Sequence, residues 1–133
     1  MVSFMFLAVL ALMNCPATTV RVVDGATLRA CGERVRLAAI DAPERPGHCL
    51  RGRVCTPGDG WGSKANLQRL IDARGVQLQV IDVDQYGRLV ACVTIGAKDL
   101  SHAQVADGFA VERYRPLTDC DHPHTGPRSG RWP

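Results

Sequence analysis

The stretch from residue 34 to residue 44, Arg-Val-Arg-Leu-Ala-Ala-Ile-Asp-Ala-Pro-Glu, most constrains how this chain can fold. Its first part alternates in two sets that would face opposite sides of a strand, Val35, Leu37 and Ala39 against Arg34, Arg36 and Ala38. A period of two is typical of a half-buried strand. Pro43 lacks a backbone N–H and disfavours helical backbone at Ala42. We therefore predict a strand that carries an arginine and leads directly into two carboxylates, Asp41 and Glu44, at a sharp turn.

The length and charge of the chain set wide bounds on its function. Its 133 residues suffice for one domain with a real core. The net charge is +3, and arginine supplies most of the positive charge because Lys64 and Lys98 are the lysines of the chain. A planar guanidinium suits phosphate better than a point charge does. The balance favours an anionic partner without identifying one.

The N-terminal segment has the character of a secretory signal. The first charged side chain is Arg21, and an apolar run extends from Phe4 to Met13. That run is too short to span a bilayer but fits the hydrophobic region of a signal. We predict a signal peptide over residues 1–17, a folded domain over 18–115 and a flexible tail over 116–133. Two alternatives are acylation of Cys15 and a buried N-terminal strand or helix.

Six cysteines in so short a chain favour an oxidising compartment, so we expect a secreted or periplasmic protein. Cys49 and Cys55 bracket one loop, and a disulfide between them would close a small ring. Cys31 could pair with Cys92 across strands. Removal of Cys15 with a signal peptide would leave Cys120 without a partner. The sequence does not fix the connectivity.

The remaining elements follow from periodicity and from Gly and Pro punctuation. Strands are predicted by alternation or by β-branched runs at 18–23, 27–30, 76–80 and 89–95. Helices are predicted at 63–73, with Ser63 or Asp59 as the cap, and at 100–107, with Asp99 or Ser101 as the cap. Residues 45–60 form a long loop, and 84–88 a hairpin turn. This order predicts an α+β, mainly β fold, a five-stranded OB-fold barrel, closed or partly open, with two helices.

Four motifs in this order resemble the thermonuclease, or staphylococcal nuclease-like, family from about Val20 to Tyr114. They are Val-Val-Asp-Gly-x-Thr-Leu from residue 22, Arg-Val-Arg-Leu-x-x-Ile-Asp-Ala-Pro-Glu from 34, Asp-x-Tyr-Gly-Arg-Leu-Val-Ala from 84 and Asp-Gly-Phe-Ala from 107. Each motif alone is a weak signal, whereas the set at this spacing is specific.

The resemblance implies a role for each matching residue. Arg36 and Arg88 would grip the phosphate, and Glu44 would be the general base that activates water. Asp41 and the backbone carbonyl of Ala42 would bind Ca²⁺. Tyr86 and Tyr114 would lie near the nucleotide. The chemistry is consistent with these roles, because arginines neutralise a phosphodiester as charge builds and a hard cation accepts carboxylate oxygens.

One position departs from the family pattern. The family has aspartate where this chain has Ala26, and alanine offers no oxygen to a metal ion. A unit charge about 4 Å from a divalent ion is worth several kcal/mol at an effective dielectric of about 20. Asp24, two residues upstream and on the same strand face as position 26, could hold a metal-bound water instead. Ala42 also replaces the usual threonine. We therefore expect Ca²⁺ as cofactor, bound more weakly than in the family.

The leading hypothesis is an exported, calcium-dependent nuclease that cleaves DNA or RNA, single-stranded or locally unpaired, with low sequence specificity. We expect a monomer with no stable membrane association after signal removal. The alternative is a non-catalytic OB-type nucleic-acid-binding domain, which Ala26 favours. A third hypothesis is a disulfide-stapled secreted interaction domain with no nucleic-acid role, which the modest net charge and the 5% aromatic content permit.

Overall fold

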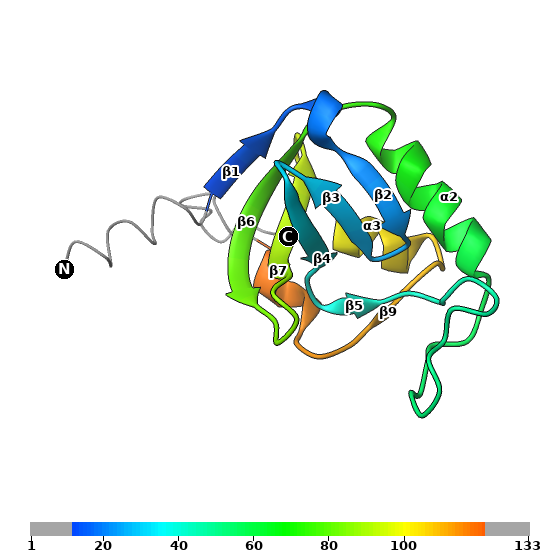
Figure 1. Cartoon of the computed structure of the whole chain (residues 1–133). Coiled ribbons are helices and arrows are strands. Elements are labelled where there is room, and N and C mark those ends of the chain that lie inside the picture. Colours follow the sequence, from blue (N-terminus) through cyan, green and yellow to red (C-terminus); the bar gives the residue numbers. More distant parts are fainter. Residues whose placement is uncertain (1–11, 122–133) are drawn as a thin grey trace.

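The computed structural model describes residues 12–121, so most of the signal-like segment and of the predicted tail lies outside the described residues. The described part is mainly β with two α-helices (Figure 1). Its main sheet has seven strands, six in the order β1-β6-β7-β4-β3-β2, with β8 paired to β7. Their bounds are β1 Leu12–Cys15, β2 Arg21–Asp24, β3 Thr27–Ala30, β4 Glu33–Leu37, β6 Val76–Val83, β7 Leu89–Ile95 and β8 Lys98–Asp99.

The pairing confirms the predicted class but not a closed barrel. The strands β4 and β7 pair in parallel, and the other neighbours in the main sheet are antiparallel. Within residues 12–121, the hydrogen-bonded path ends at β1 and at β2 without joining them. Of the two predicted forms, closed or partly open, the closed barrel is therefore not observed, and β1 adds a strand beside β6 that the prediction lacked. The mainly β arrangement with two helices is consistent with an OB-like fold.

The strand predicted from residue 34 divides in two. Val35 and Leu37 are buried and Arg34 is exposed, as the alternation predicts. The alternation stops at Ala39, whose φ of 72° lies in the left-handed region. The chain turns there and continues as β5 (Ile40–Asp41), which pairs with β9 (Val111–Glu112) in a separate two-stranded sheet. This turn lets Asp41 come back toward β4.

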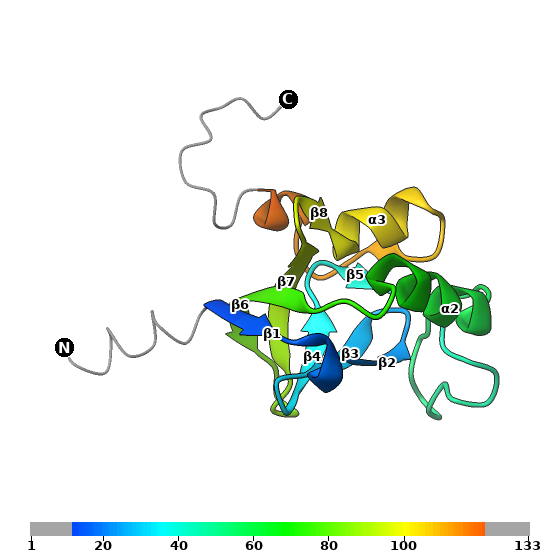
Figure 2. The same ribbon diagram turned by 90° about the horizontal axis from the view of Figure 1, so that it is seen from above.

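Two capped helices lie on the same side of the sheet (Figure 2). The helix α2 (Gly60–Ile71) begins three residues before the predicted start, because the Asp59 carboxylate accepts the Gly62 N–H at 2.9 Å. The helix α3 (Leu100–Ala106) is capped by Asp99, whose side chain accepts the His102 N–H at 2.8 Å. Between residues 12 and 121, no helix is long and apolar enough to cross a membrane.

Two short 3-10 helices lie near the ends of the described residues. The first, η1 (Ala17–Thr19), occupies the start of the strand predicted at 18–23, so β2 begins only at Arg21. The second, η2 (Leu117–Cys120), gives regular structure to the described start of the predicted tail.

All six cysteines form disulfides, and only one pairing matches a predicted one. Cys49 is bonded to Cys55 within the long loop, as predicted. Cys15 pairs with Cys31, and Cys92 pairs with Cys120. The predicted Cys31–Cys92 pair and the unpaired Cys120 are therefore wrong. The physical reason is that β1 joins the sheet beside β6 and brings Cys15 to Cys31, with a Cα–Cα distance of 5.2 Å.

Candidate functional site

Arg36 and Asp41 face each other across the turn at Ala39. Arg36 Nη2 lies 3.6 Å from Asp41 Oδ1, and the same nitrogen donates to the carbonyl of Ile40 at 3.4 Å. The Asp41 side chain is only 5% exposed, and that of Arg36 is 16% exposed. A carboxylate so buried must be paired or hydrogen-bonded. Two predicted site residues therefore meet, but as partners of each other.

Two further residues complete the surroundings of Asp41. Its Oδ2 atom accepts a hydrogen bond from Thr56 Oγ1 at 2.8 Å and one from Arg113 Nη1 at 3.0 Å. Arg113 follows β9, and the pairing of Asp41 with Val111 carries it to the site. Thr56 and Arg113 were not predicted as site residues, since nothing in the local pattern links them to Asp41, which lies 15 and 72 positions away. Both oxygens of Asp41 are thus engaged with the protein itself.

Arg88 is held by the turn that precedes β7. Asp84 Oδ2 accepts the Arg88 Nε–H at 2.7 Å, while Asp84 Oδ1 accepts the backbone N–H groups of Tyr86 and Arg88 at 2.9 and 3.0 Å. Partial burial acts to raise the pKa of the Asp84 carboxyl, but the hydrogen bonds from Arg88 and Tyr86 outweigh it and lower that pKa. The carboxylate therefore keeps its charge and fixes the guanidinium. The four-residue spacing of Asp84 and Arg88 across the turn at Gly87 is the sequence feature that could have predicted this ion pair.

The register of β4 and β7 puts Arg36 and Arg88 on one face. Val90 is the partner of Arg36, and Leu89 is the partner of Val35. Side chains alternate along a strand, so Arg88, Val90 and Arg36 share a side of the sheet. Of the two arginines predicted to grip phosphate, Arg36 therefore lies in β4 and Arg88 immediately before the adjacent strand β7.

Glu44 lies three residues beyond Asp41 and is half-buried. Its backbone is pressed against the first residue of α2, because a Cβ added to Gly60 would collide with the carbonyl of Glu44 and the nitrogen of Arg45. Within residues 12–121, no group forms a hydrogen bond or ion pair with the Glu44 carboxylate. In contrast to Asp41, its carboxylate has no hydrogen-bonding or ionic partner among the described residues. Gly60 is a positioning residue that the sequence analysis missed.

The turn from Asp24 to Ala26 does not have the predicted geometry. Asp24 ends β2, and its Oδ1 atom accepts the Ala26 N–H at 2.9 Å, so both residues belong to a turn rather than to one strand face. The turn packs against the candidate site, since a Cβ at Gly25 would lie 3.0 Å from the Ala42 Cβ. The buried Gln104 fixes it by donating to the Gly25 carbonyl at 2.8 Å. Ala26 is completely buried.

These groups do not fit a calcium ion. Calcium takes six to eight oxygen ligands, usually with several carboxylates. Within the described part of the chain, no group of three or more His, Cys, Asp or Glu side chains could hold a metal ion. The side chain of Ala26 has no oxygen and its carbonyl accepts the Leu37 N–H at 2.9 Å, Asp24 caps its own turn, and Asp41 is paired with two arginines and Thr56. The donors predicted for Ca²⁺ therefore lie near each other without forming a coordination shell.

The two tyrosines predicted to lie near the nucleotide are both exposed, Tyr86 at 63% and Tyr114 at 66%. The guanidinium carbon of Arg88 lies 5.4 Å from the centre of the Tyr86 ring, and that of Arg113 lies 5.1 Å from the Tyr114 ring. Each ring thus packs beside an arginine of the site, which leaves ring surface open to solvent. Such exposed rings can stack on nucleic-acid bases.

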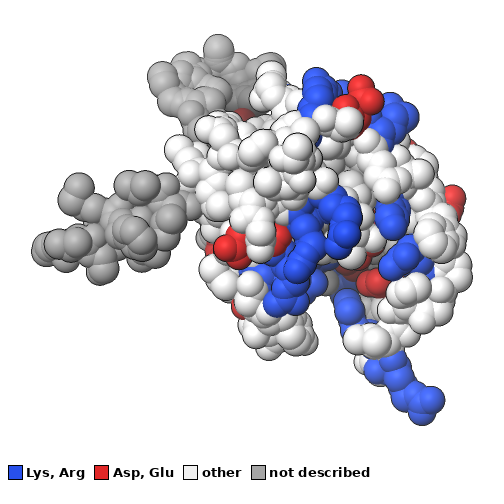
Figure 3. All heavy atoms as spheres, turned by 45° about the horizontal axis from the view of Figure 1, so that its top comes forward, with Lys and Arg blue, Asp and Glu red and all other residues white. Residues whose placement is uncertain are grey.

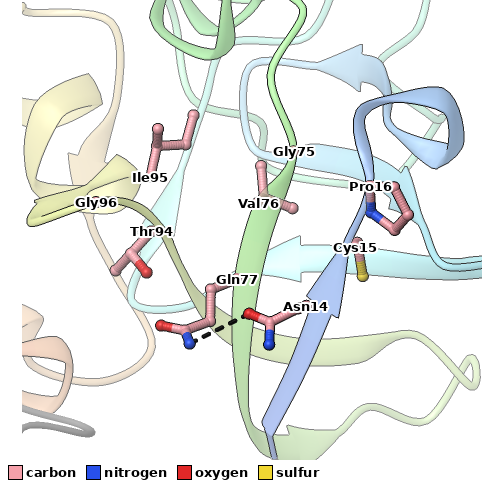
Figure 4. A pocket seen from close by; sticks show the side chains of 9 residues that line it. All are labelled: Asn14, Cys15, Pro16, Gly75, Val76, Gln77, Thr94, Ile95 and Gly96. Atoms are coloured by element: carbon pink, nitrogen blue, oxygen red, sulfur yellow. Dashed lines mark hydrogen bonds between the residues drawn. The ribbon is translucent and has the colours of Figure 1, made fainter.

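A hollow of about 560 Å³ lies away from these residues, beside β1, β6 and the turn after β7 (Figure 4). Its polar features include the amides of Asn14 and Gln77, where Gln77 Nε2 donates to Asn14 Oδ1 at 3.3 Å. None of its lining residues carries a charge. The hollow offers neither a general base nor a cation for phosphate, so it plays no part in the candidate site.

Comparisons with known proteins bear on the same region. The model of the family described as "Staphylococcal nuclease homologue" matches residues 34–125. The succinoglycan biosynthesis protein ExoI of Rhizobium meliloti (strain 1021) is 35% identical over 94 residues, which are 69% of this chain and 49% of that protein. The probable endonuclease LCL3 of Yarrowia lipolytica is 34% identical over 84 residues, 59% of this chain and 34% of that protein. The probable endonuclease LCL3 of Saccharomyces cerevisiae (strain RM11-1a) is 37% identical over 84 residues, which are 58% of this chain and 28% of that protein. This chain therefore spans half or less of the length of these curated relatives.

Proposed function

The chain belongs to the staphylococcal nuclease homologue family, and we propose that it binds DNA or RNA and hydrolyses phosphodiester bonds with low sequence specificity. The observation that carries the proposal is the shared face of Arg36 and Arg88, with the Glu44 carboxylate, which no residue between 12 and 121 pairs, just beyond the Arg36–Asp41 pair. Relatives named probable endonucleases support the same activity. A single-stranded or locally unpaired substrate fits best, because the exposed rings of Tyr86 and Tyr114 need unpaired bases to stack on.

The proposed reaction uses groups of this chain alone. Glu44 takes a proton from a water molecule, and the water oxygen forms a bond to phosphorus. Arg36 and Arg88 donate hydrogen bonds to the non-bridging oxygens as negative charge builds on them. The bond from phosphorus to the leaving oxygen then breaks, and that oxygen takes a proton from solvent. General base catalysis typically contributes about 10²–10⁴-fold, and each well-placed donor about 10²–10³-fold.

No step is assigned to a metal ion, because the donors around Ala26 and Asp41 do not form a calcium shell. The family resemblance implies that activity depends on Ca²⁺. We propose that this dependence is the property in which this chain differs most from the family pattern. A specific alternative follows from the same observation. A non-catalytic domain that grips nucleic acid would keep Arg36, Arg88 and the tyrosines but would not need metal-binding oxygens.

Three disulfides support export to an oxidising compartment, secreted or periplasmic. A cut after Ala17 would detach β1 and leave Cys31 without Cys15. We therefore propose that any signal cleavage occurs before residue 12, so that Cys15 stays in the mature domain. The intact mass of the protein recovered after export tests this boundary, and a mature chain that begins at Thr18 would overturn it.

Cleavage of labelled oligonucleotides tests the function directly. Purified protein is incubated with single-stranded DNA and RNA, with calcium or with a chelator, beside Glu44→Gln and Ala26→Asp variants. Cleavage by the parent that Glu44→Gln abolishes supports the nuclease. No cleavage by the parent, with a gain in Ala26→Asp, supports a binding domain that has lost its metal. No cleavage by either protein would overturn the enzyme proposal.

A further inference from the structure

Three arginines stand in one row across β2, β3 and β4. The register pairs Arg21 with Arg29, and Arg29 with Arg34. All three side chains are exposed. The residues next to them, Val22, Leu28 and Val35, form the matching row on the other face, which packs into the core. The arginines therefore project from the outer face of the sheet, and Figure 3 shows Lys and Arg side chains gathered over the region where these strands lie in Figure 1.

This row carries positive charge without internal compensation. Within residues 12–121, no carboxylate lies within 4.0 Å of a guanidinium nitrogen of Arg21, Arg29 or Arg34. The acidic residues Asp24 and Glu33 lie in these strands but do not neutralise the row. Asp24 accepts the Ala26 N–H, and Glu33 is exposed at the start of β4. Like charges directly opposite each other destabilise a sheet. Such a row is better explained by an anionic ligand than by folding.

The row leads to the candidate site. The Arg34 guanidinium donates to the carbonyl of Tyr86, in the turn that holds Arg88. Arg36 lies two residues further along β4 on the same face, and Arg88 immediately precedes Leu89, the partner of Val35. Positive side chains therefore run from the edge strand β2 to the proposed phosphate-binding pair without changing face. Neighbouring strands lie about 4.8 Å apart, so the row spans roughly 10 Å.

We propose that this row, Arg21, Arg29 and Arg34, binds the sugar-phosphate backbone of a single-stranded nucleic acid. The contacted backbone lies to one side of the phosphate that Arg36 and Arg88 bind. The inference rests on the proposed function, since it places the strand by the Arg36–Arg88 site. It adds a second binding region that makes recognition depend on substrate length. Backbone contacts of this kind carry no sequence information.

The test compares two variants with equal changes of charge. Arg21→Gln/Arg29→Gln removes two members of the row and leaves Arg34 in place, because Arg34 also supports the Tyr86 turn. The control, Arg69→Gln/Lys98→Gln, removes two positive charges from α2 and β8. Binding of four- and twelve-nucleotide thymidine oligomers is measured at several salt concentrations with calcium absent. Thermal unfolding checks that each variant folds.

We expect the row variant to lose most of the affinity gain between the short and the long oligomer. Its plot of log K against log salt should be shallower by about 1.4, since each backbone contact to a single strand contributes about 0.7. The control should keep the parent's slope and length dependence. If the parent binds the long oligomer and the row variant binds it in the same way as the control variant, this inference alone is overturned. A parent that binds neither oligomer at low salt would overturn the proposed function and this inference together.

Discussion

The two halves of the candidate site differ in how their charges are used. In the arginine half, Arg36 and Arg88 share a face of β4 and β7, and the Asp84 turn fixes Arg88. In the carboxylate half, Ala26 has no side-chain oxygen, and Asp41 is already paired with Arg36, Arg113 and Thr56. The contrast is that Asp84 orients Arg88 from within one turn, whereas Asp41 is enclosed by partners from three separate segments. Glu44 lies at the border, with its carboxylate unpaired by any described residue.

The largest effect is expected at Glu44. Glu44→Gln keeps the size of the side chain but cannot take a proton from water, so cleavage should fall by about 10²–10⁴-fold. Oligonucleotide affinity should not fall, because the arginine half is untouched. Single-turnover cleavage and equilibrium binding measure the two properties separately. The matched control is Glu33→Gln, an exposed carboxylate of β4, and an equal loss in both variants would remove Glu44 from the mechanism.

Asp41 distinguishes a structural from a metal-binding carboxylate. Asp41→Ala leaves the Arg36 and Arg113 guanidinium groups without their buried partner. Breaking a buried pair in this way should lower the free energy of unfolding by about 3 kcal/mol. Urea denaturation in the presence of a chelator measures it. If Asp41→Ala is as stable as the parent in chelator, and less stable than the parent only when calcium is present, Asp41 is a metal ligand.

Gly60 tests whether the start of α2 positions the general base. Alanine at this position favours helix but would collide with the backbone of Glu44 and Arg45. Misplacement of a catalytic group by about 1 Å can cost up to about 10²-fold in rate. We expect Gly60→Ala to slow cleavage strongly while its affinity for oligonucleotide stays near that of the parent. Unchanged cleavage in a folded variant would show that Glu44 needs no such support.

The smallest effect is expected at Asp84. Its pKa in the folded protein is lowered from the ordinary value of 3.8, so its contribution to stability is present above that value and is lost as pH falls through the folded pKa. Asp84→Asn should lower the free energy of unfolding by about 1–2 kcal/mol at neutral pH. The difference from the parent should shrink below about pH 4. A difference that stays constant down to pH 2 would mean that the charge of Asp84 does not hold the turn.

Local patterns predicted much of the arginine half. The alternation of Arg34 to Leu37 gave the correct inward and outward faces of β4, and the turn residues around Gly87 placed Arg88 at the start of β7. These features depend on neighbours in the chain, so periodicity and turn chemistry suffice to find them. The caps of both helices were also among the predicted alternatives.

The carboxylate half depends on contacts between distant segments. The left-handed turn at Ala39 has no glycine to announce it, and it redirects the strand into β5. Arg113 reaches Asp41 only because β5 pairs with β9. Likewise, Cys15 meets Cys31 because β1 joins the sheet beside β6. No residue in these segments carries a local sign of its partner, which is why the sequence alone suggested a different disulfide pattern and did not predict the Asp41–Arg113 pair.

Calcium titration of the parent and of Ala26→Asp, followed by oligonucleotide binding in the same buffer, tests this contrast most directly. The structure predicts that the parent binds oligonucleotide in a salt-dependent manner but shows no saturable calcium binding at millimolar concentrations. Ala26→Asp should gain calcium affinity, because it restores a carboxylate beside the segment that contains Asp41 and Ala42. Calcium binding by the parent as tight as that of Ala26→Asp would contradict the account.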